Sequence, residues 1–151
     1  MTTIVVGVDG SQGAADALRF AIEEARVRGA EVKAVNAWHV PPAAFGGGWV
    51  PPVVDLDEFR EFARSSLEKA VEDVARSGSD VKVTPVLGEG QPADVLCAAA
   101  TGADLLVVGS RGLGGFRGLL LGSVSQQCAH HAPCPVVIVP GSRVSDHQAK
   151  D

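Results

Sequence analysis

The chain has 151 residues, the usual size of one domain, and its 46% hydrophobic and 21% charged residues are ordinary for a globular protein. It has no apolar run long enough to span a membrane as a helix, and its net charge of −5 argues against a nucleic-acid partner. The first residues lack the basic region of a signal peptide, and three cysteines are an odd number for a disulfide framework. We therefore expect a cytoplasmic protein with neither a membrane nor a nucleic acid as partner.

Strands and helices are expected to alternate along the first half of the chain. Residues 3–9 form a β-branched run typical of a strand buried on both faces. Ser11 is a good N-cap for a helix over 12–28, and Gly29 is a natural end for that helix. Residues 31–38 predict a second strand. The segment 39–54 contains four prolines and three glycines, so it predicts a long loop without a regular element.

The second half continues the alternation. A helix over 55–77 should bury one face, made of Leu56, Phe59, Ala63, Leu67, Ala70, Val71 and Val74. Strands are expected at 81–87, 103–109 and 135–140, with helices at about 91–101 and 121–131. Pro85 suits a strand at the edge of a sheet. We expect a single domain over residues 1–141, followed by a polar tail over 142–151.

Strands joined by helices imply parallel neighbours and right-handed crossovers. The sequence therefore predicts an α/β fold, an open, doubly wound parallel sheet of five strands with helices on both faces. Such Rossmann-like sheets bind ligands beyond the carboxyl ends of their strands, where the strand order reverses. This rule directs attention to the loops that follow Asp9, Trp38 and Gly109.

The loop after the fourth expected strand has an unusual glycine spacing. From residue 109 it reads Gly, two residues, Gly, nine residues, Gly-Ser, and six of its first fourteen residues are glycine. Glycines let backbone N–H groups approach an anion, and a helix that begins at Gly122 adds further donors. The hydroxyls of Ser123 and Ser125 could donate to phosphate oxygens. No Asp or Glu occurs between residues 105 and 145, so the segment predicts a phosphate site.

A side chain added at Gly109 or Gly122 is expected to occupy the space of the phosphates. Such a variant should lose nucleotide binding and keep its fold.

The same spacing, with Val124 and Ser125 following it, resembles the signature of ATP-binding members of the universal stress protein family. The opening residues 4–11 resemble the family's first strand and its aspartate, and residues 134–139 resemble its last strand. The resemblance covers almost the whole chain. It implies a Rossmann-like fold of the adenine-nucleotide-binding type.

The resemblance also implies a role for individual residues. Asp9, with the backbone of Gly7 and Val8, would lie near the ribose, and Ala37 would offer backbone groups to the adenine. The residues expected around the phosphates are Gly109, Ser110, Arg111, Gly112, Gly114, Gly115, Gly122, Ser123, Val124 and Ser125, with Arg117 as a further candidate. The implied ligand is ATP, or ADP, AMP or cyclic AMP, with Mg²⁺ accompanying a triphosphate. The last strand, 136–139, would pair with its copy in a homodimer.

Three other motifs are weaker. Residues 88–93 fit a dinucleotide fingerprint, but no acidic residue follows about 20 positions later. The lysine of a P-loop is absent. His130 and His131 lie between Cys128 and Cys134, but adjacent histidines point to different faces of a helix, so we expect no metal ligated by side chains there.

No residue presents itself as a nucleophile or general base, so we expect no catalytic residue and at most weak ATPase activity. The favoured function is a nucleotide-binding regulatory or stress-response protein that acts as a switch or as a dimeric partner-binding module. The alternatives are a slow enzyme that hydrolyses ATP or transfers its phosphate or adenylate group, and a cyclic AMP-binding protein. A fold that binds no nucleotide and acts by dimerisation is a further alternative.

Overall fold

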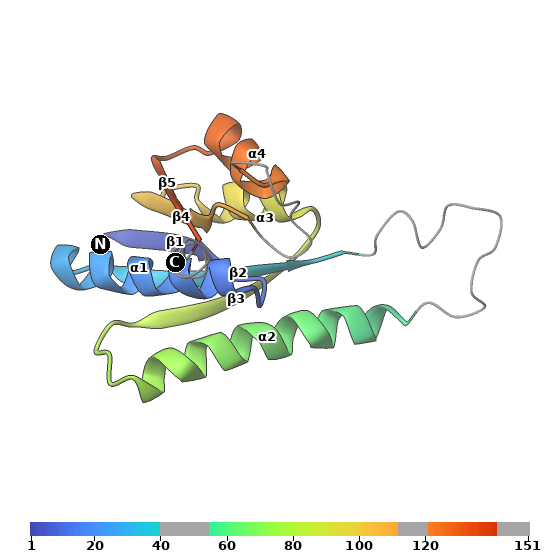
Figure 1. Cartoon of the computed structure of the whole chain (residues 1–151), viewed down its shortest axis with the longest axis horizontal. Coiled ribbons are helices and arrows are strands. Elements are labelled where there is room, and N and C mark those ends of the chain that lie inside the picture. Colours follow the sequence, from blue (N-terminus) through green and yellow to red (C-terminus); the bar gives the residue numbers. More distant parts are fainter. Residues whose placement is uncertain (40–54, 112–120, 142–151) are drawn as a thin grey trace, which may run out of the picture.

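The computed structural model describes residues 1–39, 55–111 and 121–141, which form one parallel sheet flanked by helices (Figure 1). The strands are β1 (Thr3–Gly7), β2 (Glu31–Trp38), β3 (Val83–Glu89), β4 (Leu105–Gly109) and β5 (Val136–Val139). The helices are α1 (Gln12–Arg28), α2 (Leu56–Arg76), α3 (Pro92–Ala99) and α4 (Ser123–His131). The strand order is β3-β2-β1-β4-β5, and every pair of neighbours is parallel. The predicted open, doubly wound α/β sheet is confirmed.

The helices cover both faces of the sheet, α1 and α2 on one and α3 and α4 on the other (Figure 1). Alternate residues of β1 point into the two core layers: Ile4 and Val6 pack with α1 and α2, whereas Val5 packs with α3 and α4. Both layers are packed with buried apolar side chains, which explains why β1 and β4 consist almost entirely of aliphatic residues.

The start and the end of α1 follow the expectation from sequence. The Ser11 hydroxyl accepts a hydrogen bond from the N–H of Ala14 at 3.1 Å, which satisfies one of the free donors of the first turn. Gly29 ends the helix with φ = 65°, a left-handed conformation that glycine adopts without strain. The predicted apolar face is buried along its whole length, at Ala14, Leu18, Ala21, Ile22 and Ala25.

Helix α2 departs from the expectation at its beginning. Ala63 and Leu67 are buried, but Leu56 is 48% and Phe59 40% exposed. The prediction that these two residues belong to the core face is therefore wrong. Helical spacing identifies the face of a helix, but the length of the sheet beneath decides how much of that face is covered.

The ends of the other elements lie within about two residues of the expectation. The third strand begins at Val83 instead of residue 81, and it carries Pro85 on the edge of the sheet as expected. The predicted loop over 39–54 lies, except for His39, outside the described residues. The same holds for the polar tail over 142–151 and for residues 112–120. None of the described helices is long and apolar enough to cross a membrane.

A small cluster of thiols lies between α3, α4 and the start of β5. Cys128 is fully buried, and Cys97 lies near enough to its thiol to influence its pKa. Burial raises the pKa of Cys128 from 9.0 to about 12, and the neighbouring Cys97 adds to the rise. Burial also raises the pKa of Cys134, with further contributions from Cys97 and Asp104. The raised pKa values indicate packed, unreactive thiols.

This burial predicts a loss of stability at alkaline pH. Between pH 9 and about 12 the folded protein keeps the Cys128 proton that the unfolded chain releases, so the free energy of unfolding falls as the pH rises. Urea unfolding of the wild type and of Cys128→Ala at pH 7.5, 9 and 10.5 tests this. The variant should be less stable by about 1 kcal/mol at pH 7.5, and its stability should decline less steeply above pH 9. Parallel declines would show that Cys128 does not titrate as stated.

Candidate functional site

The strand order reverses between β1 and β4. From β1 the chain passes to α1 on one face of the sheet, and from β4 it passes to α4 on the other. A cavity of about 580 Å³, within the range of small-molecule sites, opens at the carboxyl ends of these strands. We call it the strand-end cavity. It is lined by Gly7, Val8, Asp9, Ser11, Ala14, Val35, Asn36, Ala37, Trp38, His39, Phe59, Phe62, Ala63, Pro92, Leu96, Val108, Gly109, Arg111, Gly122, Ser123, Val124 and Ser125.

Most of the site residues expected from sequence line this cavity together. They are Gly7, Val8, Asp9, Ala37, Gly109, Arg111, Gly122, Ser123, Val124 and Ser125. Ser110 lies beneath the lining and is buried. Gly112, Gly114 and Gly115, with Arg117, lie outside the described residues. Three loops that are distant in sequence thus meet at one edge of the sheet.

Asp9 connects the end of β1 to the start of α1. Its Oδ1 accepts hydrogen bonds from the Ser11 backbone N–H at 2.9 Å and from the Ser11 hydroxyl at 2.5 Å. The Ser11 hydroxyl in turn accepts from α1 at Ala14. The turn between them passes through Gly10 at φ = 88°. The carboxylate is therefore held in a fixed position at the middle of the cavity wall.

The backbone of Ala37 is exposed to the cavity because β1 ends before it. The last hydrogen bond from β1 to β2 runs from the Val8 N–H to the Val35 carbonyl at 2.8 Å. The Trp38 carbonyl accepts from Gly90 on the opposite side, next to β3. Consecutive residues of a parallel strand bond to opposite neighbours, so the N–H and C=O of Ala37 face the β1 side, beyond the end of that strand. Within the part of the chain that the structure describes, no partner is found for this donor and acceptor pair at the cavity.

The connection from β4 to α4 is closed by hydrogen bonds around Ser110. The Ser110 carbonyl accepts from the Gly122 N–H at 2.6 Å, and the Ser125 hydroxyl lies 3.1 Å from the same oxygen. That hydroxyl is also 2.9 Å from the Gly122 carbonyl. Ser125 is 2% exposed, and its single proton is shared between these two carbonyls. Its hydroxyl thus holds the loop closed, whereas sequence reasoning expected it to donate to a phosphate.

The N-terminus of α4 remains the main source of donors. Gly122 is its N-cap, and glycine has no side chain to bond to the free N–H groups of the first turn. The exposed Ser123 hydroxyl accepts from Gln127 at 2.9 Å, which orients it and leaves its own proton for another acceptor. Arg111 lines the same end of the cavity. This end is suited to an anion.

The opposite end of the cavity is apolar and was not expected from sequence. Phe59 and Phe62 of α2 line it from one face of the sheet, and Pro92 and Leu96 of α3 line it from the other. Asn36 lies within β2 and is 7% exposed, and its side-chain amide donates to the Ala63 carbonyl at 3.0 Å. The signal for this contact was an asparagine between the apolar residues Val35 and Ala37 of β2, because a buried amide needs a partner.

The role of Gly109 differs from the expectation. A Cβ at this position would lie 2.9 Å from the Gly13 carbonyl oxygen, in the first turn of α1. A Cβ at Gly13 would likewise lie 2.8 Å from the Arg111 carbonyl oxygen. The two glycines allow α1 to pack against the loop after β4, and this explains them without any phosphate. We therefore expect Gly109→Ala to disturb the packing of α1 as well as any phosphate site.

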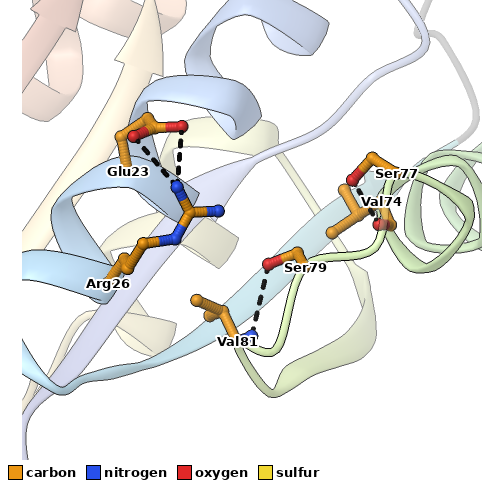
Figure 2. Close-up of polar contacts among 6 residues, drawn as sticks. All are labelled: Glu23, Arg26, Val74, Ser77, Ser79 and Val81. Atoms are coloured by element: carbon orange, nitrogen blue, oxygen red, sulfur yellow. Dashed lines mark hydrogen bonds and ion pairs between the residues drawn. The ribbon is translucent and has the colours of Figure 1, made fainter.

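A second cavity of about 610 Å³ lies between α1 and α2, away from the glycine loop. Several polar groups in and beside this cavity bond to partners within the protein (Figure 2). Arg26 bonds to Glu23 at 3.4 Å, and the Ser77 hydroxyl donates to the Val74 carbonyl at 2.6 Å. The Ser79 hydroxyl accepts from the Val81 N–H at 3.2 Å. The Arg26 contact lies within α1, and the two serine contacts stabilise the end of α2 and the turn that follows it.

Residues of the types that ligate metals are scattered in the described parts of the chain. No group of three or more histidine, cysteine, aspartate or glutamate residues there could hold a metal ion.

Known proteins match this chain over most of its length. The model of the universal stress protein family matches residues 1–140. The chain belongs to this family. A universal stress protein of Thermus aquaticus is 36% identical over 143 residues, which cover 91% of this chain and 97% of that protein.

Other relatives in the universal stress protein family are longer. A Mycolicibacterium smegmatis protein is 36% identical over 137 residues, which are 90% of this chain and 45% of that protein. The chain therefore spans about half the length of that mycobacterial relative.

Solved structures of universal stress proteins agree with the fold. One, solved in complex with cAMP, is 30% identical with a TM-score of 0.67, and the match covers 93% of this chain and 98% of that one. The universal stress protein of Archaeoglobus fulgidus, solved in complex with dAMP, is 29% identical with a TM-score of 0.67, covering 92% and 98%.

The packing of Gly109 predicts a structural cost for a single methyl group. Gly109→Ala should lower the free energy of unfolding by about 1–3 kcal/mol, because the Gly13 carbonyl must move. Gly141→Ala is the matched control, since no atom lies within 4 Å of its added Cβ. Urea unfolding of both variants measures the difference. Equal stability of the two would mean that α1 and the loop after β4 do not pack as described.

Proposed function

We propose that the protein binds an adenine nucleotide in the strand-end cavity and acts as a regulatory module. The observation that carries the proposal is the joining of three features in one cavity: the uncapped start of α4, the fixed carboxylate of Asp9, and the free strand edge at Ala37. They lie on β4, β1 and β2 in that order across the sheet. Phosphate, ribose and base follow one another in the same order along a nucleotide. We place this activity in the cytoplasm, as expected from three free thiols.

The base is recognised by the backbone of Ala37. Adenine carries a donor at N6 beside an acceptor at N1, and the adjacent C=O and N–H of a strand edge complement that pair. Guanine has the reverse order at the corresponding positions, an acceptor at O6 and a donor at N1. The edge therefore favours adenine.

The phosphates lie at the start of α4. The free N–H groups after Gly122 and the hydroxyl of Ser123 donate to phosphate oxygens, and Arg111 adds a positive charge. Hydrogen bonds to charged groups contribute roughly 1.5–3 kcal/mol each, so a few of them suffice for micromolar affinity. Asp9 accepts from the ribose hydroxyls between the two ends.

The two relatives solved with cAMP and dAMP support an adenine ligand of this kind. The glycine spacing of this loop resembles that of ATP-binding members of the family, so we propose ATP as the ligand. The Mg²⁺ that accompanies a triphosphate would be ligated mainly by phosphate and water oxygens. Asp9 is the carboxylate that the described cavity lining offers to it.

Binding without turnover is the function we favour. The Ser11 hydroxyl donates to the Asp9 carboxylate, but the same hydroxyl caps the first turn of α1, so we assign neither residue a catalytic role. The ligand contacts elements from both faces of the sheet, and occupancy would fix α2 and α4 relative to one another. A partner that binds α2 or α4 would then have different affinities for the nucleotide-bound and the empty protein.

Calorimetric titration tests the proposal directly. The wild type should bind ATP and AMP with micromolar affinity, and GTP at least tenfold more weakly. No binding of ATP, ADP, AMP or cyclic AMP would refute it. Release of phosphate at several turnovers per minute would favour the alternative of an enzyme.

A substitution at the N-cap of α4 separates fold from binding. Gly122 has φ = −73° and ψ = 170°, which any residue adopts, and aspartate is a favoured N-cap. Gly122→Asp should therefore be at least as stable as the wild type, yet its carboxylate should occupy the free N–H groups and repel phosphate. We expect at least a tenfold loss of ATP affinity by calorimetry, with an unchanged urea midpoint. Unchanged affinity would place the phosphates elsewhere.

We further propose a homodimer through β5. This strand is at the edge of the sheet, and its four residues are all aliphatic. Pro135 and Val139 direct their carbonyls to β4, so the backbone groups of Val136 and Ile138 face outward. An open edge of this kind pairs with its own copy.

The dimer can be tested with a matched pair of variants. Ile138→Pro removes the outward N–H, whereas Ile138→Ala loses a similar amount of packing and keeps that N–H. Light scattering at tens of micromolar should show a dimer for the wild type and Ile138→Ala, and a monomer for Ile138→Pro. A monomeric wild type, or a dimeric Ile138→Pro, would contradict pairing through β5.

A further inference from the structure

We propose that Phe59 and Phe62 of α2 form an aromatic wall that stacks on the base of the bound nucleotide. The inference rests on the proposed function and adds to it the residues that hold the flat face of the base. It concerns the apolar end of the strand-end cavity. The Ala37 backbone is assigned only the hydrogen-bonding edge of the base.

The exposure of the two rings is the first observation. Phe59 is 40% and Phe62 69% exposed, although each is among the most apolar side chains of the protein. Both also line the cavity, so their exposed area faces a hollow that a ligand can fill. Exposed apolar area at a concave site is typical of a binding surface.

A hydrogen bond anchors the turn of α2 that carries the two rings to the sheet. Phe59 lies four residues before the buried Ala63 and three before Phe62, so the two rings are carried by the turn of α2 that Ala63 anchors. The Ala63 carbonyl accepts the hydrogen bond from Asn36 at 3.0 Å, and Ala63 is buried. Asn36 in turn directly precedes Ala37 in β2. This hydrogen bond therefore links the turn of α2 that carries the rings to the edge of β2 that is proposed to bind the base.

A second wall lies across the cavity. Pro92 and Leu96 reach it from α3, which packs on the opposite face of the sheet from α2. Two apolar walls that flank a polar strand edge form a slot. A flat, weakly solvated ring with polar atoms only on its rim is the ligand that fits such a slot. Phosphate and ribose offer no such surface, so the wall acts on the base alone.

The test compares ligands with and without a base. The variants are Phe59→Ala, Phe62→Ala and the double variant that carries both changes. Leu56→Ala is the matched control. Leu56 lies on the same helix and is 48% exposed, but it is outside the cavity lining. Alanine is a better helix former than phenylalanine, and these side chains are exposed, so the variants should fold. Calorimetry measures the affinity of each variant for AMP and for ribose 5-phosphate.

Stacking predicts at least a fivefold loss of AMP affinity for each single variant, with ribose 5-phosphate unchanged. Phe62→Trp, which keeps an aromatic ring, should restore AMP binding. Nuclear Overhauser contacts between phenylalanine ring protons and adenine H2 or H8 should appear in the wild-type complex.

Three results would overturn the inference. The first is AMP affinity that is unchanged in the double variant, and the second is an equal loss for AMP and ribose 5-phosphate. The third is a loss in Leu56→Ala that matches the loss in Phe59→Ala. Each leaves AMP binding by the wild type in place. A wild type that does not bind AMP would instead refute the proposed function, and the aromatic wall with it.

Discussion

The hydrogen bond from the Gly122 N–H to the Ser110 carbonyl, at 2.6 Å, is the contact on which the geometry of the site depends. It brings the start of α4 back to the end of β4, so the free donors of that helix lie at the point where the strand order reverses. The buried hydroxyl of Ser125 strengthens the same closure. A second constraint acts from α1, whose first turn packs against the loop through Gly13 and Gly109 without side chains between the backbones. Both constraints involve backbone atoms, and this explains why glycine and serine are concentrated here.

The cavity has two ends that differ in chemistry because they are built by different helices. The β4 end holds the helix N-terminus and Arg111, with no acidic residue among its described neighbours in sequence from 105 to 141. The β2 end holds two aromatic rings and aliphatic groups from α2 and α3. Asp9 lies between them on β1, the central strand. A ligand that is charged at one end, apolar at the other and rich in hydroxyls between them fits this gradient, and a nucleotide has that order of groups.

Local signals were enough to predict much of this structure. The strand and helix order, the N-cap at Ser11, the stop at Gly29 and the edge position of Pro85 all follow from patterns within a few residues. The sequence also identified the loops that meet at the cavity.

Prediction from sequence failed where the role of a residue depends on contacts between distant segments. Gly109 lacks a side chain because a carbonyl of α1 lies against it. The Ser125 hydroxyl donates to carbonyls of its own loop, and Phe59 is exposed because the sheet covers α2 only in part. The bond from Asn36 to Ala63 spans 27 positions, and no periodicity reveals it.

The position of the ligand gives a regulatory role a physical basis. A molecule that binds only the folded state stabilises it in proportion to the logarithm of its concentration over its dissociation constant. In this protein the stabilisation would not be uniform, because the proposed ligand joins α4 and the loop after β4 to the first turns of α2. The start of α2 is the part of that helix with the most exposed apolar surface, and its anchor at Ala63 is a single side-chain hydrogen bond. Nucleotide occupancy would therefore change the order of α2 more than that of β1, which is paired on both sides by β2 and β4. A partner that contacts α2 would distinguish the loaded from the empty protein even though the sheet is the same in both.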